Sequence, residues 1–258
     1  MVVQIHLVRH AQGFHNLCVE NEALRDPLLT DLGKQQCADL RAAFPHHDRL
    51  AHLVASPLRR TLETCLLGFS TGEAPKNKVI ALPELQEVSD APCDTGSAVA
   101  EVEPEFRERG VDFSRVPEDW TEKQSEKSPW EPTLAKLEVR AREARRKLRE
   151  IAAGGGDVVA VTHGGFLHFL TTDFHGIDDG KDCETATGWK NTEFRSYTFA
   201  DETGEDPEAL LVETEESWRR RQGEKNRPSA DEQAERKRVF YRDMEPFLKY
   251  TAERGWMQ

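Results

Sequence analysis

The stretch Val2-Val3-Gln4-Ile5-His6-Leu7-Val8-Arg9-His10-Ala11-Gln12-Gly13 opens the chain with a short apolar, β-branched run that ends in a polar turn. This pattern is typical of a buried strand followed by a loop. Similar runs occupy residues 50–55, 157–162 and 194–199, and a shorter one occupies residues 79–82. We therefore predict five short strands.

Helical patterns lie between these strands. Residues 34–44 follow a capping residue, either Thr30 or Asp31, and stop at Pro45. We predict further helices at residues 58–67, with Pro57 in the first turn, at 134–151, at 166–174 and near 230–241. Strands that alternate with helices imply an α/β fold, here a three-layer α/β/α sandwich with a mostly parallel central sheet.

Two polar stretches interrupt this alternation. Residues 89–132, after the third strand, lack a clean period and contain repeated prolines, as expected of a long functional insertion or cap. Residues 201–227 are strongly charged, and we expect a surface loop there that leads into the last helix. No internal repeat divides the chain. We therefore expect a single domain over residues 1–258, with a charged loop and a helix forming its last part, residues 201–258.

The composition limits the kind of ligand. The 258 residues include 35 Lys and Arg against 47 Asp and Glu, which gives a net charge of −12 and a pI near 5.3. Nucleic acid is bound through clustered positive charge, so we do not expect it as a partner. No apolar run approaches the roughly 18 residues that a membrane helix requires, so we expect no membrane partner either. Any phosphate group must bind in one small pocket.

The cysteines and the N-terminus indicate the compartment. The five cysteines (Cys18, Cys37, Cys65, Cys93 and Cys183) are odd in number, widely spaced and without a C-x-x-C pair. This argues against a disulfide framework or a structural zinc site and favours a reducing compartment. The first apolar run is too short for a signal peptide and has no basic segment before it. We expect a cytoplasmic protein.

Groups suited to binding an anion follow three of the predicted strands. These groups are Arg9 and His10 after the first strand, Arg60 after the second, and His163 after the strand at 157–162. Ligands of open α/β sheets bind beyond the carboxyl ends of the strands, so we expect these side chains to meet. The helix N-termini that follow add free N–H groups. After the third strand, Glu84 and Glu87 offer carboxyl groups for proton transfer.

The order of these motifs resembles branch 1 of the histidine phosphatase superfamily, also called phosphoglycerate mutase-like. The resemblance rests on five segments: Arg-His within residues 7–16, Leu-Thr-x-x-Gly within 27–33, the second arginine within 56–61, Leu-x-Glu at 85–87 and the second histidine within 161–165. The matches span residues 3–170, and residues 191–196 extend them to 199. The resemblance therefore covers most of the first 200 residues.

The resemblance implies a phosphomonoesterase that acts on a phosphorylated small molecule, without a metal or other cofactor. At the matching positions, His10 would attack phosphorus and form a phosphohistidine. Glu87 would protonate the leaving oxygen and then activate water, which calls for a raised pKa. The catalytic residues would be His10, Glu87 and His163, and the phosphate-binding residues would be Arg9, Arg60 and Asn16.

The chain also departs from the family pattern. Ala11 replaces the usual Gly, and Gly13 stands where a Ser or Thr hydroxyl commonly contacts phosphate. Residues 88–94 lack the Leu-Asn-Glu-Arg-His-Tyr-Gly stretch of the mutases, which favours a phosphatase. The alternatives are a phosphoglycerate mutase, a bisphosphate phosphatase, or a non-catalytic module that binds a phosphorylated ligand.

Some assignments stay open on the sequence. Glu84 or Asp90 would be the acid if Glu87 were only a surface carboxylate. His15 either lines the pocket or is a loop residue without a chemical role. The identity of the substrate and the oligomeric state are also open at this stage.

Overall fold

The computed structural model describes residues 2–70, 78–174 and 188–250, and within them seven strands form one sheet. The strands are β1 Ile5–Arg9, β2 Leu50–Ala55, β3 Val79–Ala81, β4 Val111–Asp112, β5 Asp157–Thr162, β6 Phe194–Phe199 and β7 Leu211–Glu213. Their order in the sheet is β4-β3-β2-β5-β1-β6-β7. The pairs from β4 to β1 are parallel, and β6 and β7 join antiparallel at one edge. The predicted mostly parallel sheet is confirmed.

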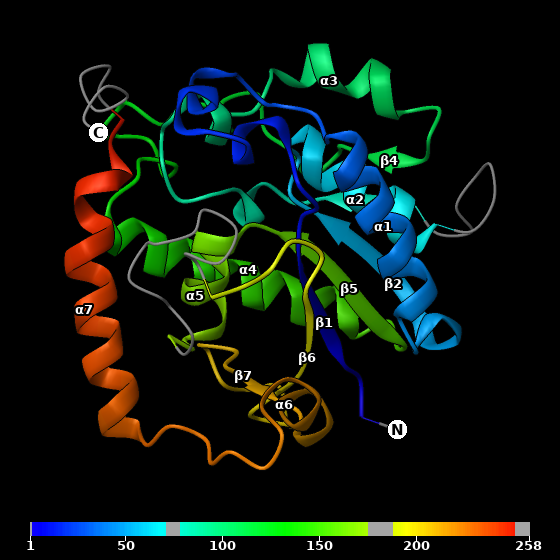
Figure 1. Ribbon diagram of the computed structural model, residues 1–258, viewed down its shortest axis with the longest axis vertical. Coiled ribbons are helices and arrows are strands. Elements are labelled where there is room, and N and C mark those ends of the chain that lie inside the picture. Colours follow the sequence, from blue (N-terminus) through cyan, green and yellow to red (C-terminus); the bar gives the residue numbers. More distant parts are fainter. Residues whose placement is uncertain (1, 71–77, 175–187, 251–258) are drawn as a thin grey trace.

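Helices cover both faces of this sheet (Figure 1). They are α1 Asp31–Ala43, α2 Arg59–Phe69, α3 Val99–Phe106, α4 Leu134–Ala152, α5 Gly164–Thr171, α6 Glu215–Gln222 and α7 Ala230–Leu248. Short 3₁₀ turns follow β1 at Phe14–Asn16 and Val19–Ala23, follow β3 at Pro83–Leu85, and lie at His47–Arg49 and Pro92–Asp94. The long helix α7 runs along the outer side of the molecule (Figure 1).

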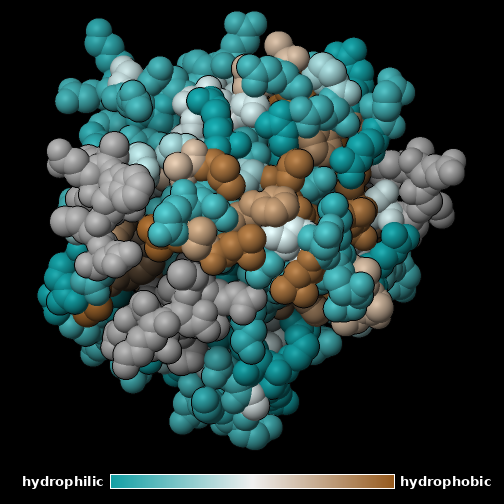
Figure 2. All heavy atoms as spheres, turned by 45° about the horizontal axis from the view of Figure 1, so that its top comes forward, coloured by the Kyte–Doolittle hydropathy of each residue, from teal (hydrophilic) through white to brown (hydrophobic). Residues whose placement is uncertain are grey.

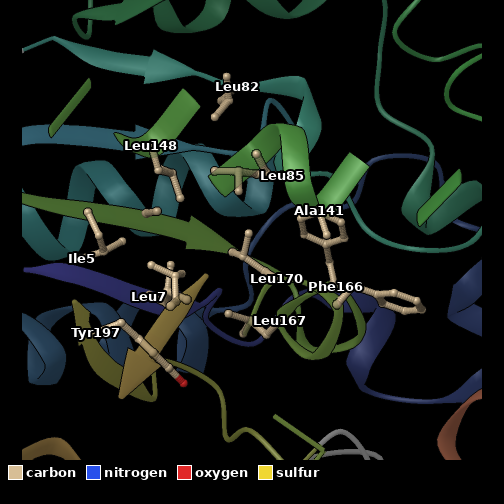
Figure 3. Close-up of a cluster of buried hydrophobic side chains, with 14 of the residues drawn as sticks. Ile5, Leu7, Leu82, Leu85, Ala141, Leu148, Phe166, Leu167, Leu170 and Tyr197 are labelled. Carbon is tan, nitrogen blue, oxygen red and sulfur yellow. The ribbon is translucent and has the colours of Figure 1, made fainter. Parts of the chain in front are cut away.

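The alternation of side chains along β5 divides the core into two layers. Val158 and Ala160 belong to the cluster that includes residues of α4, α5 and α7, and Val159 and Val161 belong to the cluster with α1 and α2. Successive side chains of a strand point to opposite faces, so a strand that is buried on both sides is apolar throughout. Figure 3 shows part of the first cluster, with Leu7 of β1 close to the helical side chains. The three-layer α/β/α arrangement is thus confirmed.

The starts of the first two helices settle one open question and correct one prediction. Thr30, not Asp31, caps α1, because its side-chain oxygen accepts a hydrogen bond from the Gly33 amide at 3.0 Å. The prediction that Pro57 lies in the first turn of the second helix was wrong. Leu58 is the N-cap of α2 and is extended, and the Thr61 hydroxyl donates to its carbonyl at 2.6 Å. α2 therefore begins at Arg59, two residues after Pro57.

Two stretches contain more regular structure than the sequence indicated. Within residues 89–132 lie α3, which buries Val102 and Phe106, and the two-residue strand β4. The expected loop at residues 201–227 contains β7 and α6. α6 carries three basic residues in its last turn and buries one large apolar side chain, Trp218, so its sequence has almost no apolar stripe. The last helix also runs on to Leu248, beyond the predicted end near residue 241.

The helix after β5 begins earlier than predicted. α5 starts at Gly164 instead of residue 166 and ends at Thr171, where Thr172 takes a left-handed conformation with φ 55°. Glycine at the first helical positions hid this start, because glycine is a poor helix former. The shift matters for the site, because it places the free amides of the helix directly after His163.

Apolar side chains are exposed along residues 14–32, which follow the carboxyl end of β1. They are Phe14, Leu17, Val19, Leu24, Leu28 and Leu32. Figure 2, which brings the top of Figure 1 forward, shows hydrophobic residues gathered near the middle of this hydrophilic face. In the described residues, Cys18, Cys37, Cys65 and Cys93 are free thiols, and Cys183 lies outside them. No helix of the described part is long and apolar enough to span a bilayer.

Candidate active site

Three adjacent strands bring the predicted anion-binding groups together. β2, β5 and β1 are neighbours in the sheet, so the residues that follow them share its carboxyl edge. The ring centroids of His10 and His163 are 5.2 Å apart. Arg60 lies between the two rings, with its Nε 3.3 Å from His10 Nε2 and its Nη2 2.9 Å from His163 Nδ1. The structure therefore joins these three residues in one cluster.

The hydrogen bonds of His10 fix the state of its ring. Nδ1 lies 2.7 Å from the Ala11 carbonyl oxygen, which only accepts, so Nδ1 carries the proton. Nε2 then presents a lone pair, and Arg60 Nε–H donates to it. Burial, and next the Arg60 charge, lower the pKa of His10 well below its ordinary value. His10 is therefore neutral at neutral pH, with Nε2 available as a nucleophile.

His163 is held in the complementary way. Its Nδ1 accepts from Arg60, so in the neutral ring Nε2–H donates to the Ser56 hydroxyl oxygen at 2.9 Å. Burial and the Arg60 charge lower the pKa of His163 as well. Both ring nitrogens have partners, so the ring plane is fixed against His10.

The two arginines are buried at the ends of their segments. Arg60 is fully buried, and its Nη2 also forms an ion pair with Asp94 at 3.2 Å. Arg9 is 4% exposed at the end of β1, and it donates to the Trp189 carbonyl. Buried guanidinium groups keep their positive charge and offer several N–H donors to a planar set of oxygens.

Glu87 lies at the N-terminus of α5. Its carboxylate accepts hydrogen bonds from the amides of Phe166 at 2.9 Å and Gly165 at 3.2 Å, and from its neighbour Val88 at 2.9 Å. Burial, and next the negative charge of Asp94, raise the pKa of Glu87, against the opposing effect of Arg60 and the amides. A carboxyl group in this setting can exist in both protonation states, as proton transfer requires.

The other carboxyl candidates face away from this cluster. Glu84 forms an ion pair with Lys147 of α4 at 2.6 Å. Asp90 accepts from the Tyr250 amide, and its own amide donates to the Leu248 carbonyl at 3.1 Å. The geometry therefore favours Glu87 over both alternatives as a group that meets a substrate.

Asn16 and His15 lie in the turn after β1. Asn16 Oδ1 accepts from the Gly13 amide at 3.0 Å, so its Nδ2 group is the part that can donate to a ligand. The His15 ring is 5.3 Å from that of His10, and its Nδ1 is buried without a partner in the described part of the chain. Burial and the Arg60 charge lower the pKa of His15. The structure thus places His15 against the cluster, which answers the question that the sequence left open.

Four residues of this region were not assigned from the sequence: Ser56, Asp94, Lys123 and Asn191. Asp94 and Lys123 belong to the stretch without a clean period, where no pattern singled them out. Asn191 donates to the His10 carbonyl at 2.8 Å and so holds the backbone of that residue. Ser56 belongs to the segment 56–61 that contains the second arginine, but only its hydrogen bond with His163 shows that it is part of the site.

The cluster as a whole combines two buried arginines, two neutral imidazoles and a partly buried carboxyl group at the carboxyl edge of a parallel sheet. This arrangement defines an α/β protein whose site carries groups suited to an anionic ligand. The family model described as "Histidine phosphatase superfamily (branch 1)" matches residues 5–205. The chain belongs to this family.

Two relatives in other organisms are similar in sequence. A phosphoglycerate mutase-like protein of Arabidopsis thaliana is 29% identical, over 76% of this chain and 84% of the relative. A probable phosphatase of Schizosaccharomyces pombe is 35% identical, over 45% of this chain and 54% of the relative. Both phosphatases and mutases thus occur among similar proteins.

Solved structures share the fold at low sequence identity. A phosphoglycerate mutase of Bacillus anthracis is 18% identical, with a TM-score of 0.50 over 83% of this chain and 92% of its own. The ecdysone phosphate phosphatase of Bombix mori, in complex with tungstate, is 15% identical, with a TM-score of 0.51 over 76% and 88%. The phosphoglycerate mutase-like fold predicted from the sequence is confirmed.

Proposed function

We propose that this chain is a single-domain phosphomonoesterase that hydrolyses a phosphorylated small molecule through a phosphohistidine at His10. The observation that carries the proposal is the state of the His10 ring. Its Nδ1 proton is held by the Ala11 carbonyl, and its Nε2 lone pair faces Arg60 and His163. A neutral imidazole fixed in this way needs no deprotonation before it attacks phosphorus.

The first step transfers the phosphoryl group to the protein. His10 Nε2 forms a bond to phosphorus while the bond from phosphorus to the ester oxygen breaks. The carboxyl group of Glu87 gives its proton to the departing oxygen and becomes a carboxylate, which the α5 amides stabilise. Arg9, Arg60 and the amide of Asn16 hold the phosphoryl oxygens, and neutral His163 orients Arg60 through the hydrogen bond that its Nδ1 accepts.

The second step returns the protein to its starting state. The Glu87 carboxylate takes a proton from water, and the water oxygen forms a bond to phosphorus as the bond to His10 Nε2 breaks. Inorganic phosphate leaves, His10 is again neutral, and Glu87 is again protonated. One carboxyl group serves both steps, since the reverse of an acid-catalysed departure is a base-catalysed attack.

The surroundings of Glu87 support hydrolysis over transfer to a second phosphate position. Lys123 and Arg140 are the buried cations closest to its backbone, and both donate to main-chain carbonyls. They therefore do not offer their charge to a second anionic group of a substrate. A mutase must hold such a group, because its product differs from its substrate only in which oxygen carries phosphate.

The test of the mechanism is the His10→Ala variant. Rapid quenching of the wild-type protein with a radiolabelled phosphate ester is expected to give an acid-labile, alkali-stable label on one histidine. His10→Ala is expected to lose both the label and turnover. Turnover at the wild-type rate in His10→Ala would overturn the mechanism.

A separate assay distinguishes the alternative functions. The protein is incubated with 3-phosphoglycerate and its bisphosphate, and both isomerisation and released phosphate are followed. We expect released phosphate without isomerisation, whereas isomerisation without release would establish a mutase. Binding of phosphate esters without any release would establish a non-catalytic module. A panel of phosphorylated metabolites ranked by kcat/KM then identifies the substrate class.

A further inference from the structure

The buried side chain of Lys123 contacts the backbone of the segment that contains Glu87. Lys123 comes from the stretch between β4 and α4 and is 2% exposed. Its ammonium group donates to three main-chain carbonyl oxygens: Asp94 at 2.7 Å, Ser89 at 2.8 Å and Glu87 at 3.2 Å. All three carbonyls belong to residues 86–94, which we call the acid loop.

These contacts use the full donor capacity of the lysine. An ammonium group has three N–H bonds, and each meets one carbonyl of the acid loop. The three carbonyls lie outside any strand or α-helix, so they have no ladder of backbone hydrogen bonds to join. A buried carbonyl left without a donor costs about 1–3 kcal/mol, so loss of the Lys123 ammonium group would destabilise this conformation of the loop.

Arg140 is a second cation that binds carbonyl groups of the acid loop. Arg140 of α4 donates to the carbonyls of Gln86 at 2.9 Å and Glu87 at 3.2 Å, and its guanidinium lies 4.5 Å from the centre of the Phe166 ring. Burial, and next the charge of Arg140, lower the pKa of Lys123 to about 7, while the charges of Asp94 and Glu87 oppose this. The Glu87 carbonyl is therefore held by both cations at once.

The acid loop also connects Lys123 to Arg60. Arg60 belongs, with Arg9, His10 and His163, to the group of side chains that we propose to bind phosphate, here called the phosphate cluster. The Asp94 carbonyl accepts from Lys123, and the Asp94 carboxylate forms an ion pair with Arg60 at 3.2 Å. The Ser89 hydroxyl donates to the same carboxylate at 2.7 Å. Both ends of the acid loop are thus fixed by one ammonium group, with Glu87 near one end and Asp94 at the other.

We propose that Lys123 is a positioning residue for the acid step: it fixes the acid loop so that Glu87 reaches the leaving oxygen of the substrate. This inference rests on the proposed function. On this proposal, the long insertion at residues 89–132 contributes to catalysis, because Lys123 lies within it. Lys123 does not touch the substrate and acts only through the backbone of residues 87, 89 and 94.

The test compares two esters that differ in their need for an acid. Phenyl phosphate has a poor leaving group, and 4-nitrophenyl phosphate has a good one. Lys123→Met removes the donors and keeps the length of the side chain. We expect its kcat/KM on phenyl phosphate, which reports the step that releases the alcohol, to fall by on the order of tenfold more than its kcat/KM on 4-nitrophenyl phosphate, as a misplaced general acid predicts. Inhibition by vanadate, which tests the phosphate cluster, is expected to change less than about twofold.

Lys136 provides a matched control. Its ammonium group also donates to main-chain carbonyls, those of Glu126 and Ser128, and it binds the Glu131 carboxylate at 2.8 Å. Lys136→Met breaks the same kind of contact without reaching the acid loop. It is expected to lower the melting temperature without changing the ratio of the kcat/KM values on the two esters. Lys123→Arg, which keeps the charge but not the three-carbonyl geometry, is expected to fold and to show a smaller change of the same sign.

The outcomes separate the two proposals. Equal losses on both esters in Lys123→Met and Lys123→Arg, or no loss in either, would overturn the positioning role. If Lys123→Met does not fold, Lys123→Arg alone tests the positioning role, through the ratio of its kcat/KM values on the two esters. Glu87→Gln measured alongside shows whether an acid step exists at all. A selective loss in Glu87→Gln without one in the Lys123 variants refutes only this inference, whereas a wild-type protein without phosphatase activity refutes the proposed function.

Discussion

His10 and Glu87 depart from their ordinary pKa values in opposite directions, and burial is the first cause of both shifts. Burial disfavours charge, so it lowers the pKa of the imidazole and raises that of the carboxyl group. The proposed nucleophile is thereby kept neutral and the proposed acid is kept protonated over a wider range of pH. One physical effect prepares both partners of the first step.

The pH profile follows from these two shifts. His10 must be neutral, so kcat/KM on an unactivated ester is expected to fall as the pH drops through its lowered pKa. Glu87 must be protonated, so kcat/KM is expected to fall again as the pH rises through its raised pKa. Glu87→Gln is expected to abolish the alkaline limb and to leave the acidic limb. Because the pKa of Lys123 is about 7, an alkaline limb that persists in Glu87→Gln but disappears in Lys123→Met would belong to Lys123, whereas one that persists in both variants would assign the acid to another group.

Ser56 is expected to matter through the orientation of His163. Ser56→Ala removes the acceptor of the His163 Nε2–H group, a bond of 2.9 Å between buried groups. The loss of about 1 kcal/mol predicts a decrease of about fivefold in kcat/KM, measured by steady-state kinetics. Ser114→Ala, at an exposed position, is the control and is expected to leave kcat/KM unchanged. An unaffected Ser56→Ala would show that the ring is held well enough by Arg60 alone.

At the scale of residues, the sequence predicts those parts of the cluster that lie at or soon after the ends of strands. Arg9 ends β1, His10 and His163 directly follow β1 and β5, and the parallel sheet places them beside Arg60 in the first turn of α2. Asp94 and Lys123 could not be found in this way. Their positions depend on how an irregular segment folds back on the sheet, and no periodic pattern encodes that path.

The first turn of α1 is an element whose packing constrains the site. A Cβ atom added at Gly33 would lie 2.1 Å from the Gln12 carbonyl oxygen, and Gln12 is two residues from His10. Gly33→Ala must therefore move either the helix or the turn that follows β1. We expect a loss of about 2 kcal/mol in the free energy of unfolding, measured in urea, together with a lower kcat/KM.

Gly68 in α2 is the matched control for this substitution. A Cβ atom there would lie 3.3 Å from a methyl group of the Leu40 side chain, which can move, and not from backbone. Gly68→Ala is expected to change the free energy of unfolding by less than about 0.5 kcal/mol and to leave kcat/KM unchanged. Equal stability of Gly33→Ala and the wild-type protein would contradict the close approach.

At the scale of elements, long apolar patterns predict helices and strands correctly, whereas short polar segments of the sequence do not reveal the elements that they form. β5 is apolar at most positions because it is buried on both faces, and α4 shows a clear apolar stripe. α3 has eight residues including Pro104, and β4 has two, so neither offers a period to detect. The strand β7 and the helix α6 form within the charged stretch because Leu211 and Trp218 are buried there, which local composition does not show.

The whole molecule carries a net charge of −12, while the groups that we propose to bind phosphate lie in one buried cluster. A dianionic ester therefore meets repulsion at long range and attraction only on contact. The Debye length is about 10 Å at about 0.1 M salt, so added salt screens the long-range repulsion more than the buried contacts.

The salt dependence of the reaction is expected to follow from this balance. We expect kcat/KM for a dianionic ester to rise by a factor on the order of two as ionic strength increases from about 0.02 M to about 0.2 M. Inhibition by the added anion at the phosphate cluster is measured separately and corrected for. A fall in kcat/KM with salt after that correction would show that local attraction extends beyond the pocket.

The acid loop gathers its supports from distant parts of the chain: Lys123, Arg140 and, through the amide of Asp90, the carbonyl of Leu248. During synthesis on the ribosome, His10, Arg60 and His163 all emerge before Leu248 does. The residues that we propose to hold phosphate are thus synthesised before the last anchor of the acid loop. On the proposed function, the part of the site that binds phosphate is complete in the growing chain before the part that positions the acid.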